Sequence, residues 1–199
     1  MNADYIENII RNIEDQSYRC ILIDGAWGIG KSYMVEKALE DLKGRTCFVS
    51  LFGMDNAQQI YHEILFQLFF QTPDGGKMVK WLRDATKFLG NFNWKAKTIN
   101  TVLESRFSEQ DAVVILSRRF ETKHVIVIDD LERCENNLSL REVFGVVEAL
   151  KQCNNIQVVI IANTDEIEAK EDFEKYNEKV IDRVFRVTEY SNKVKWGEL

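Results

Sequence analysis

Eight consecutive residues near the start of the chain combine glycines with a lysine and a hydroxyl group. The pattern G-x-x-x-x-G-K-[ST], typical of a phosphate-binding loop or Walker A motif, is matched in full by Gly25-Ala26-Trp27-Gly28-Ile29-Gly30-Lys31-Ser32. Glycines tolerate positive φ and close backbone approach, so consecutive N–H groups can point inward at a phosphate. The stretch therefore predicts a site for the phosphates of a nucleotide.

Two side chains of this loop can act on a triphosphate. Lys31 is placed to reach the β- and γ-phosphates, and the Ser32 hydroxyl is placed to bind Mg²⁺. A helix that begins here adds the partial positive charge and the unpaired N–H groups of its N-terminus. The residues expected to contact the nucleotide are Gly25, Ala26, Trp27, Gly28, Ile29, Gly30, Lys31, Ser32 and Tyr33.

A second group of candidate residues follows an unbroken apolar run at 125–128. The run ends in Asp129-Asp130-Leu131-Glu132, and apolar residues followed by acids are typical of the Walker B motif. Asp129 is the predicted Mg²⁺ ligand because a hard divalent ion prefers carboxylate oxygen. Asp130 or Glu132 would then polarise the attacking water. The alternative is a strand that ends in a solvated acidic turn.

Further candidates stand near the ends of two later strands. Asn163 follows the apolar run 156–162 and could hold the attacking water or sense the γ-phosphate, or simply start a turn and cap a helix. Three arginines could stabilise transition-state charge within the chain or across a subunit interface, and Arg183 is preferred to Arg133 and Arg186. Surface or salt-bridged roles remain open for all three.

The elements that must position these residues alternate between strands and helices. Short apolar or β-branched runs predict strands at about 18–23, 46–52, 125–129, 156–162 and 184–187. Helical spacing predicts helices at about 4–15, 33–42, 56–71, 77–89, 108–120 and 139–152, and two short helical pieces near 165–173 and 176–181. Such alternation predicts an α/β fold: a mainly parallel sheet with helices on both faces.

Composition places the chain among globular proteins of one domain. It has 199 residues, 45% of them hydrophobic and 29% charged. No apolar run approaches 18 residues and the N-terminus lacks the pattern of a secretory signal, so we expect no membrane span and a cytoplasmic location. Four widely spaced cysteines are expected to be reduced thiols, and His62 and His124 to be structural.

One segment departs from the overall negative charge of −6. Residues 77–97 contain six lysines and arginines against one acid, interleaved with Trp81, Phe88, Phe92 and Trp94. Basic residues among aromatics can bind a nucleic-acid strand or an anionic lipid surface. A solvated amphipathic helix is the default interpretation, so the sequence leaves nucleic acid open as a partner.

The loop at 25–32 with its tryptophan, together with Ile128-Asp129-Asp130-Leu131-Glu132-Arg133-Cys134, resembles the KAP family of P-loop NTPases. Residues 49–53 also resemble that family's second strand. The resemblance implies a three-layer sandwich with a five-stranded sheet of order 5-1-4-3-2, binding and hydrolysis of ATP with Mg²⁺, and the roles given above for Lys31, Ser32 and Asp129. Two departures stand out, because the family usually has Asp where this chain has Glu132 and many members carry membrane helices between the two motifs.

The sequence thus predicts a single P-loop NTPase domain over 1–199, with a helical insertion at about 56–120. The expected function is ATP hydrolysis that couples the nucleotide state to a protein partner or to a second copy of the chain. Its expected catalytic residues are Lys31, Asp130, Glu132, Asn163 and Arg183. A regulatory module that holds nucleotide with negligible turnover is the alternative, and a small-molecule kinase is a third, weaker possibility. The absence of an Asn-Lys-x-Asp guanine motif favours ATP over GTP.

Overall fold

A five-stranded parallel sheet forms the centre of the molecule. The computed structural model describes residues 3–42, 44–70, 109–119, 122–134 and 138–188. Its strands are β1 (Cys20–Asp24), β2 (Thr46–Ser50), β3 (His124–Asp129), β4 (Ile156–Ala162) and β5 (Arg183–Arg186). Their order is β2-β3-β4-β1-β5 and every pairing is parallel. Read from the other edge, this order confirms the predicted 5-1-4-3-2.

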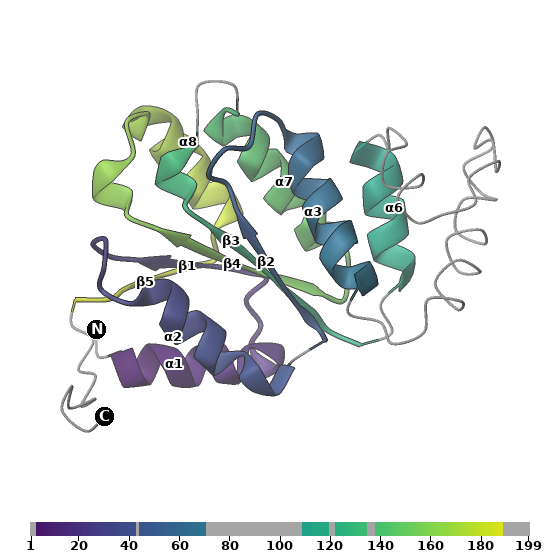
Figure 1. The fold of residues 1–199 in the computed structure, drawn as a ribbon. Coiled ribbons are helices and arrows are strands. Elements are labelled where there is room, and N and C mark those ends of the chain that lie inside the picture. Colours follow the sequence, from purple (N-terminus) through teal and green to yellow (C-terminus); the bar gives the residue numbers. More distant parts are fainter. Residues whose placement is uncertain (1–2, 43, 71–108, 120–121, 135–137, 189–199) are drawn as a thin grey trace, which may run out of the picture.

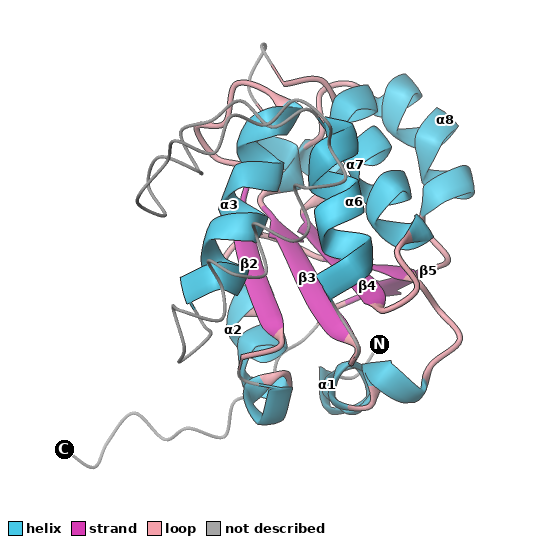
Figure 2. Ribbon diagram, turned by 90° about the vertical axis from the view of Figure 1, so that its right-hand side faces the viewer, coloured by secondary structure: helices cyan, strands magenta, loops and turns pink. Residues whose placement is uncertain are grey.

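Helices cover both faces of the sheet, which gives the predicted three layers (Figures 1 and 2). One face carries α1 (Ala3–Arg11) and α2 (Lys31–Ala38). The other carries α3 (Ala57–Phe70), α6 (Glu109–Arg119), α7 (Leu140–Gln152) and α8 (Lys170–Val180). Single 3-10 turns lie at Ile13–Asp15, Glu40–Leu42, Leu131–Arg133 and Thr164–Glu166.

The pleat of the central strands divides the apolar core into two parts. In β1, Leu22 packs toward α3, α6, α7 and α8, whereas Ile21 and Ile23 pack toward α1 and α2. Successive strand side chains point to opposite faces, so a strand buried on both faces must be apolar throughout. All residues of β4 are buried for this reason. The sequence pattern and the layer order therefore agree.

The chain after β4 differs from the prediction in two places. The two short helical pieces were wrong: a 3-10 turn is followed by the single helix α8, which runs unbroken through the expected gap. Phe173 and Tyr176 lie one turn apart on this helix, and both rings lie 6.1 Å from the ring of Phe144 in α7. Contacts with Phe144 therefore stabilise α8 across 173–176, where the mostly polar local sequence does not indicate a continuous helix. The last strand also begins one residue earlier than predicted, at Arg183.

Several predictions fall on residues that the structure does not describe. The turn at 72–76, the helix at 77–89 and the whole basic segment 77–97 lie outside the described residues. Of the predicted insertion at 56–120, the structure describes α3 and α6, which contact each other.

Candidate functional site

The glycine loop connects the end of β1 to the start of α2. Gly28 has φ of 74° and Gly30 has φ of 91°, the left-handed region that favours glycine. Gly30 is the N-cap of α2, so the first N–H groups of this helix face the loop. Gly25 lies against Val187, the residue after β5, and an added Cβ would stand 2.8 Å from the Val187 carbonyl oxygen. The loop thus has the backbone conformation that phosphate binding requires.

Lys31 lies inside the loop with only 8% of its surface exposed. Its Nζ donates to the carbonyl oxygens of Gly25 at 2.7 Å and Ala26 at 3.1 Å. Burial lowers the pKa of Lys31, and the nearby carboxylates, Glu132 foremost, counter part of that effect. The ammonium group therefore holds two carbonyl oxygens of the loop and stands where phosphate oxygens could bind it.

The two predicted metal ligands are in direct contact. Ser32 Oγ donates to Asp129 Oδ2 at 2.6 Å, across 97 residues of sequence. Burial raises the pKa of Asp129, although hydrogen bonds from Ser32 and from the Asp130 backbone N–H oppose it. Mg²⁺ is commonly held by one or two protein oxygens together with substrate phosphates. This hydroxyl–carboxylate pair fits such an ion.

Asp130 takes a backbone conformation that is unusual for its residue type. Its φ is 62°, and among the described residues it is the one non-glycine residue with positive φ. Ser50 Oγ donates to its carboxylate at 2.7 Å, and Arg133 Nε lies 3.4 Å from the other oxygen. Such a conformation is found where surrounding contacts hold it, often at functional sites. Here it turns the chain sharply after β3 and starts the 3-10 turn that carries Glu132.

Glu132 bridges two loops at this end of the sheet. Its Oε1 accepts the Trp27 indole N–H at 2.5 Å, and its Oε2 accepts the Asn163 backbone N–H at 3.1 Å. The carboxylate therefore stands between the phosphate-binding loop and the end of β4.

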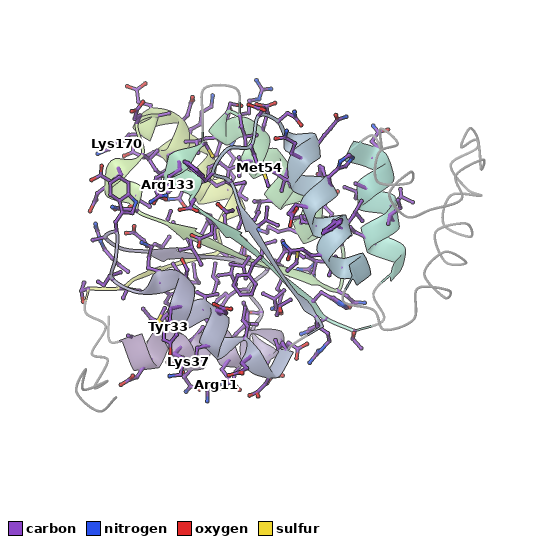
Figure 3. All side chains as sticks on the ribbon, viewed as in Figure 1. Arg11, Tyr33, Lys37, Met54, Arg133 and Lys170 are labelled. Atoms are coloured by element: carbon purple, nitrogen blue, oxygen red, sulfur yellow. The ribbon has the colours of Figure 1, made fainter. Side chains whose placement is uncertain are left out.

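A cavity of about 270 Å³ joins the two motifs. Figure 3 shows Arg133 on the side of the sheet that carries α8, and Tyr33 on α2. The lining residues of the cavity are Trp27, Gly28, Gly30, Lys31, Ser32, Tyr33, Asp129, Asp130, Glu132 and Arg133. Residues of the two sequence motifs, about a hundred positions apart, thus form one polar pocket.

Asn163 follows β4 beside this pocket and is 5% exposed. Its side chain makes no capping hydrogen bond to the following 3-10 turn. Its Oδ1 is buried and has no hydrogen-bond partner among the described residues. A buried amide oxygen without a partner is costly, and a bound water or ligand would satisfy it. Asn163 thus starts the 3-10 turn, as the alternative expected, but its side chain does not cap it.

The three candidate arginines lie in different places. Arg183 pairs in register with Ile21, and its guanidinium lies 5.5 Å from the centre of the Tyr18 ring. It therefore stands at the amino end of the sheet, and the fold does not bring it to the loop of the same chain. Arg133, by contrast, lines the cavity.

Comparison with known families decides the identity of the domain. The model of the KAP family P-loop domain matches residues 2–196, nearly the whole chain. The chain belongs to the KAP family. No match was found among curated proteins.

Solved structures of low sequence identity resemble this chain, and one of them has a TM-score above 0.5, which supports the fold. The Walker-type ATPase PABY2304 of Pyrococcus abyssi is 14% identical, with a TM-score of 0.57 over 91% of this chain and 52% of that one. Drosophila ORC bound to GC-rich DNA and Cdc6 is 11% identical, with a TM-score of 0.49 over 98% of this chain and 63% of that one. The KAP chain spans about half the length of the archaeal ATPase. Helices long and apolar enough to cross a membrane do not occur among its described residues.

Sequence reasoning missed one ion-pair group of this KAP domain. Asp24 ends β1 directly before the loop and is 3% exposed. Its carboxylate accepts the Thr164 N–H at 2.9 Å and lies 3.2 Å from Arg186 Nε, and Arg186 also pairs with Asp165. The acid at the end of an apolar strand was visible in the sequence, but its partners lie about 140 and 160 residues away. These contacts fix the start of the loop to the ends of β4 and β5.

Proposed function

We propose that this KAP domain binds ATP, hydrolyses it with Mg²⁺, and couples its nucleotide state to a protein partner or a second copy of the chain. One observation carries the proposal: Lys31, Ser32, Asp129 and Glu132 line the same cavity. Each has the residue type that phosphoryl transfer requires of it. Family membership supports nucleotide binding, and the absence of a guanine motif in the sequence favours adenine.

In this proposal the loop holds the phosphates. Backbone N–H groups around Gly28 and Gly30 supply hydrogen bonds, and Lys31 supplies a positive charge to the terminal phosphates. Ser32 and Asp129 hold the metal ion. Bound Mg²⁺ would neutralise phosphate charge as the transition state develops.

Glu132 is the acid that we assign to water activation. The carboxylate of Asp130 is bonded to Ser50 and paired with Arg133, whereas Glu132 contacts the phosphate-binding loop itself. The Asn163 side chain would bind the same water, and its buried Oδ1, which has no partner among the described residues, supports this role. Arg133 is the candidate within the chain for stabilising transition-state charge, and Arg183 could serve only a neighbouring subunit.

Separate substitutions at the two acids test the assignment. E132Q should bind Mg²⁺-ATP normally and hydrolyse it at least 100-fold more slowly, whereas D130N should retain most of its turnover. K31A should lose nucleotide binding, measured by calorimetry. Lys37 lies on the same helix with its side chain 47% exposed, so K37A is a matched control that should keep both binding and turnover.

Each outcome bears on the proposal. Normal turnover in E132Q would overturn the base assignment, and normal binding in K31A would overturn the nucleotide site. Tight retention of ATP with no turnover by the unaltered chain would instead support a regulatory binding module.

A further inference from the structure

We propose that Trp27 is a positioning residue, which holds the Glu132 carboxylate in place for water activation through its indole N–H. The inference rests on the proposed function, because it assigns a role toward the same reaction. Its basis is the hydrogen bond from Trp27 Nε1 to Glu132 Oε1 at 2.5 Å, which joins residues 105 positions apart. This contact links the Trp27 side chain of the phosphate-binding loop directly to Glu132 in the 3-10 turn after β3.

A core-packing role does not explain this tryptophan. Its side chain is 55% exposed although it is the largest apolar residue of the loop. A ring that stays half exposed contributes little free energy through the hydrophobic effect. The indole carries a single donor and no acceptor, so it can bind one carboxylate oxygen in one orientation. Its polar atom, rather than its apolar surface, makes the specific contact.

Glu132 is held from two sides, and Trp27 supplies one of them. The other carboxylate oxygen accepts the Asn163 backbone N–H at 3.1 Å. Two donors on two different loops fix both the position and the rotation of the carboxylate. Without the indole N–H, one hydrogen bond would remain and the side chain could rotate about it. Catalytic groups that move by even 1 Å from their productive position can lose about 100-fold in rate.

Neighbouring residues in turn hold the indole. The Arg133 guanidinium lies 5.7 Å from the centre of the Trp27 ring and 5.8 Å from the centre of the Phe52 ring. Both distances are within the range of cation–π attraction. Arg133 is itself paired with Asp130 at 3.4 Å. The turn after β3 therefore supports both the tryptophan and the acid that it holds.

The test compares W27F, E132Q and the double variant. W27F keeps an aromatic ring beside Arg133 and removes only the N–H donor. We expect its kcat for Mg²⁺-ATP to fall about 10- to 100-fold while its KM stays within about twofold, because the ground-state phosphate contacts remain. The double variant should be no slower than E132Q alone, since Trp27 acts through Glu132. Y5F is the control, because Tyr5 is an exposed aromatic residue of α1. Removal of its hydroxyl group should leave kcat and KM unchanged.

A second measurement observes the hydrogen bond without turnover. In ¹⁵N-tryptophan-labelled protein, the indole signal that W27F removes belongs to Trp27. That signal should move upfield in E132Q, because a neutral amide is a weaker acceptor than a carboxylate. Together the two arms separate a positioning role from a loss of folding.

Failure of the role proposed for Trp27 can be distinguished from failure of the proposed function. An unchanged or raised kcat in W27F, a multiplicative loss in the double variant, or an unmoved indole signal in E132Q would overturn the role of Trp27 and leave the ATPase intact. Absence of turnover in the unaltered chain would overturn the proposed function, and the role of Trp27 with it.

Discussion

The two ends of the sheet place acidic and basic side chains in different electrostatic environments. At the carboxyl end, desolvation disfavours the charges of Asp129, which is partly exposed, and of Lys31, which is buried. At the amino end, Asp182 and Lys151 form an ion pair of 2.9 Å. Burial thus outweighs the hydrogen bonds to the acid at the carboxyl end, whereas the hydrogen bonds to the acid outweigh burial at the amino end.

The amino end shows what a structural acid looks like in this fold. Asp182 Oδ2 accepts the backbone N–H groups of Arg19 at 2.7 Å and Cys20 at 2.8 Å. Burial alone would raise the pKa of Asp182, but the hydrogen bonds from Lys151 and from these two N–H groups outweigh it and lower the pKa. Arg19 donates to the carbonyl oxygens of Lys151 and Cys153, and its buried Nε has no hydrogen-bond partner among the described residues. An acid with several hydrogen-bond donors around it, such as Asp182, is charged at little cost, whereas Asp129 is charged against its own desolvation.

The largest expected effect is at Asp129. D129A should lower Mg²⁺-dependent ATP turnover about 1000-fold, roughly 4 kcal/mol of transition-state stabilisation. Its free energy of unfolding should stay the same or rise by about 1 kcal/mol, because a desolvated carboxylate is removed. Phosphate release and urea unfolding measure the two quantities. D172A, at an exposed acid of α8, is the control. A clear loss of stability in D129A would contradict the distinction between the two ends.

Gly25 tests whether the carboxyl end also contributes to stability. An added Cβ would meet the Val187 carbonyl oxygen at 2.8 Å, and the Val187 N–H donates to Asp24 O at 2.8 Å, so the backbone has little freedom to yield. G25A should therefore lose about 2–3 kcal/mol of unfolding free energy as well as nucleotide affinity.

Gly145 is the matched control for that change. It lies within α7, and an added Cβ there has no neighbour within 4 Å. G145A should gain about 0.5–1 kcal/mol in urea unfolding, because alanine favours the helix. An equal change of unfolding free energy in G25A and G145A would show that the contact with Val187 does not constrain the loop.

The smallest expected loss of stability is at Asp182. D182N should lose about 1 kcal/mol of unfolding free energy at pH 7, because solvent screens this partly exposed pair, and its ATP affinity should be unchanged within about twofold. Since the folded pKa of Asp182 is lowered, its contribution is complete above the unfolded value of about 4 and disappears as the pH falls through the folded value. The difference between the two proteins should thus be constant above about pH 5 and shrink in acid. A constant difference down to pH 2 would contradict the ion-pair explanation.

Much of this architecture was predictable because the information is local. The glycines of 25–32 and the apolar runs at 125–128 and 156–162 each specify an element within about ten residues, and all three lie where predicted. The break predicted between 173 and 176 was wrong because the information there is not local. The continuity of α8 depends on contacts with Phe144 in another helix. The place of Arg183 depends on the register between β5 and β1, which no local pattern encodes.

The sequence alone determined which residue types were present: a loop that can cradle phosphate, acids after a buried strand, and the strand-helix alternation that brings strand ends together. Tertiary structure alone decided their partners. It paired Ser32 with Asp129, Trp27 with Glu132 and Asp24 with Arg186, each over about 100 residues or more. The physical reason is that hydrogen-bond strength depends on tenths of an ångström, and such distances are set by the packing of the layers rather than by neighbours along the chain.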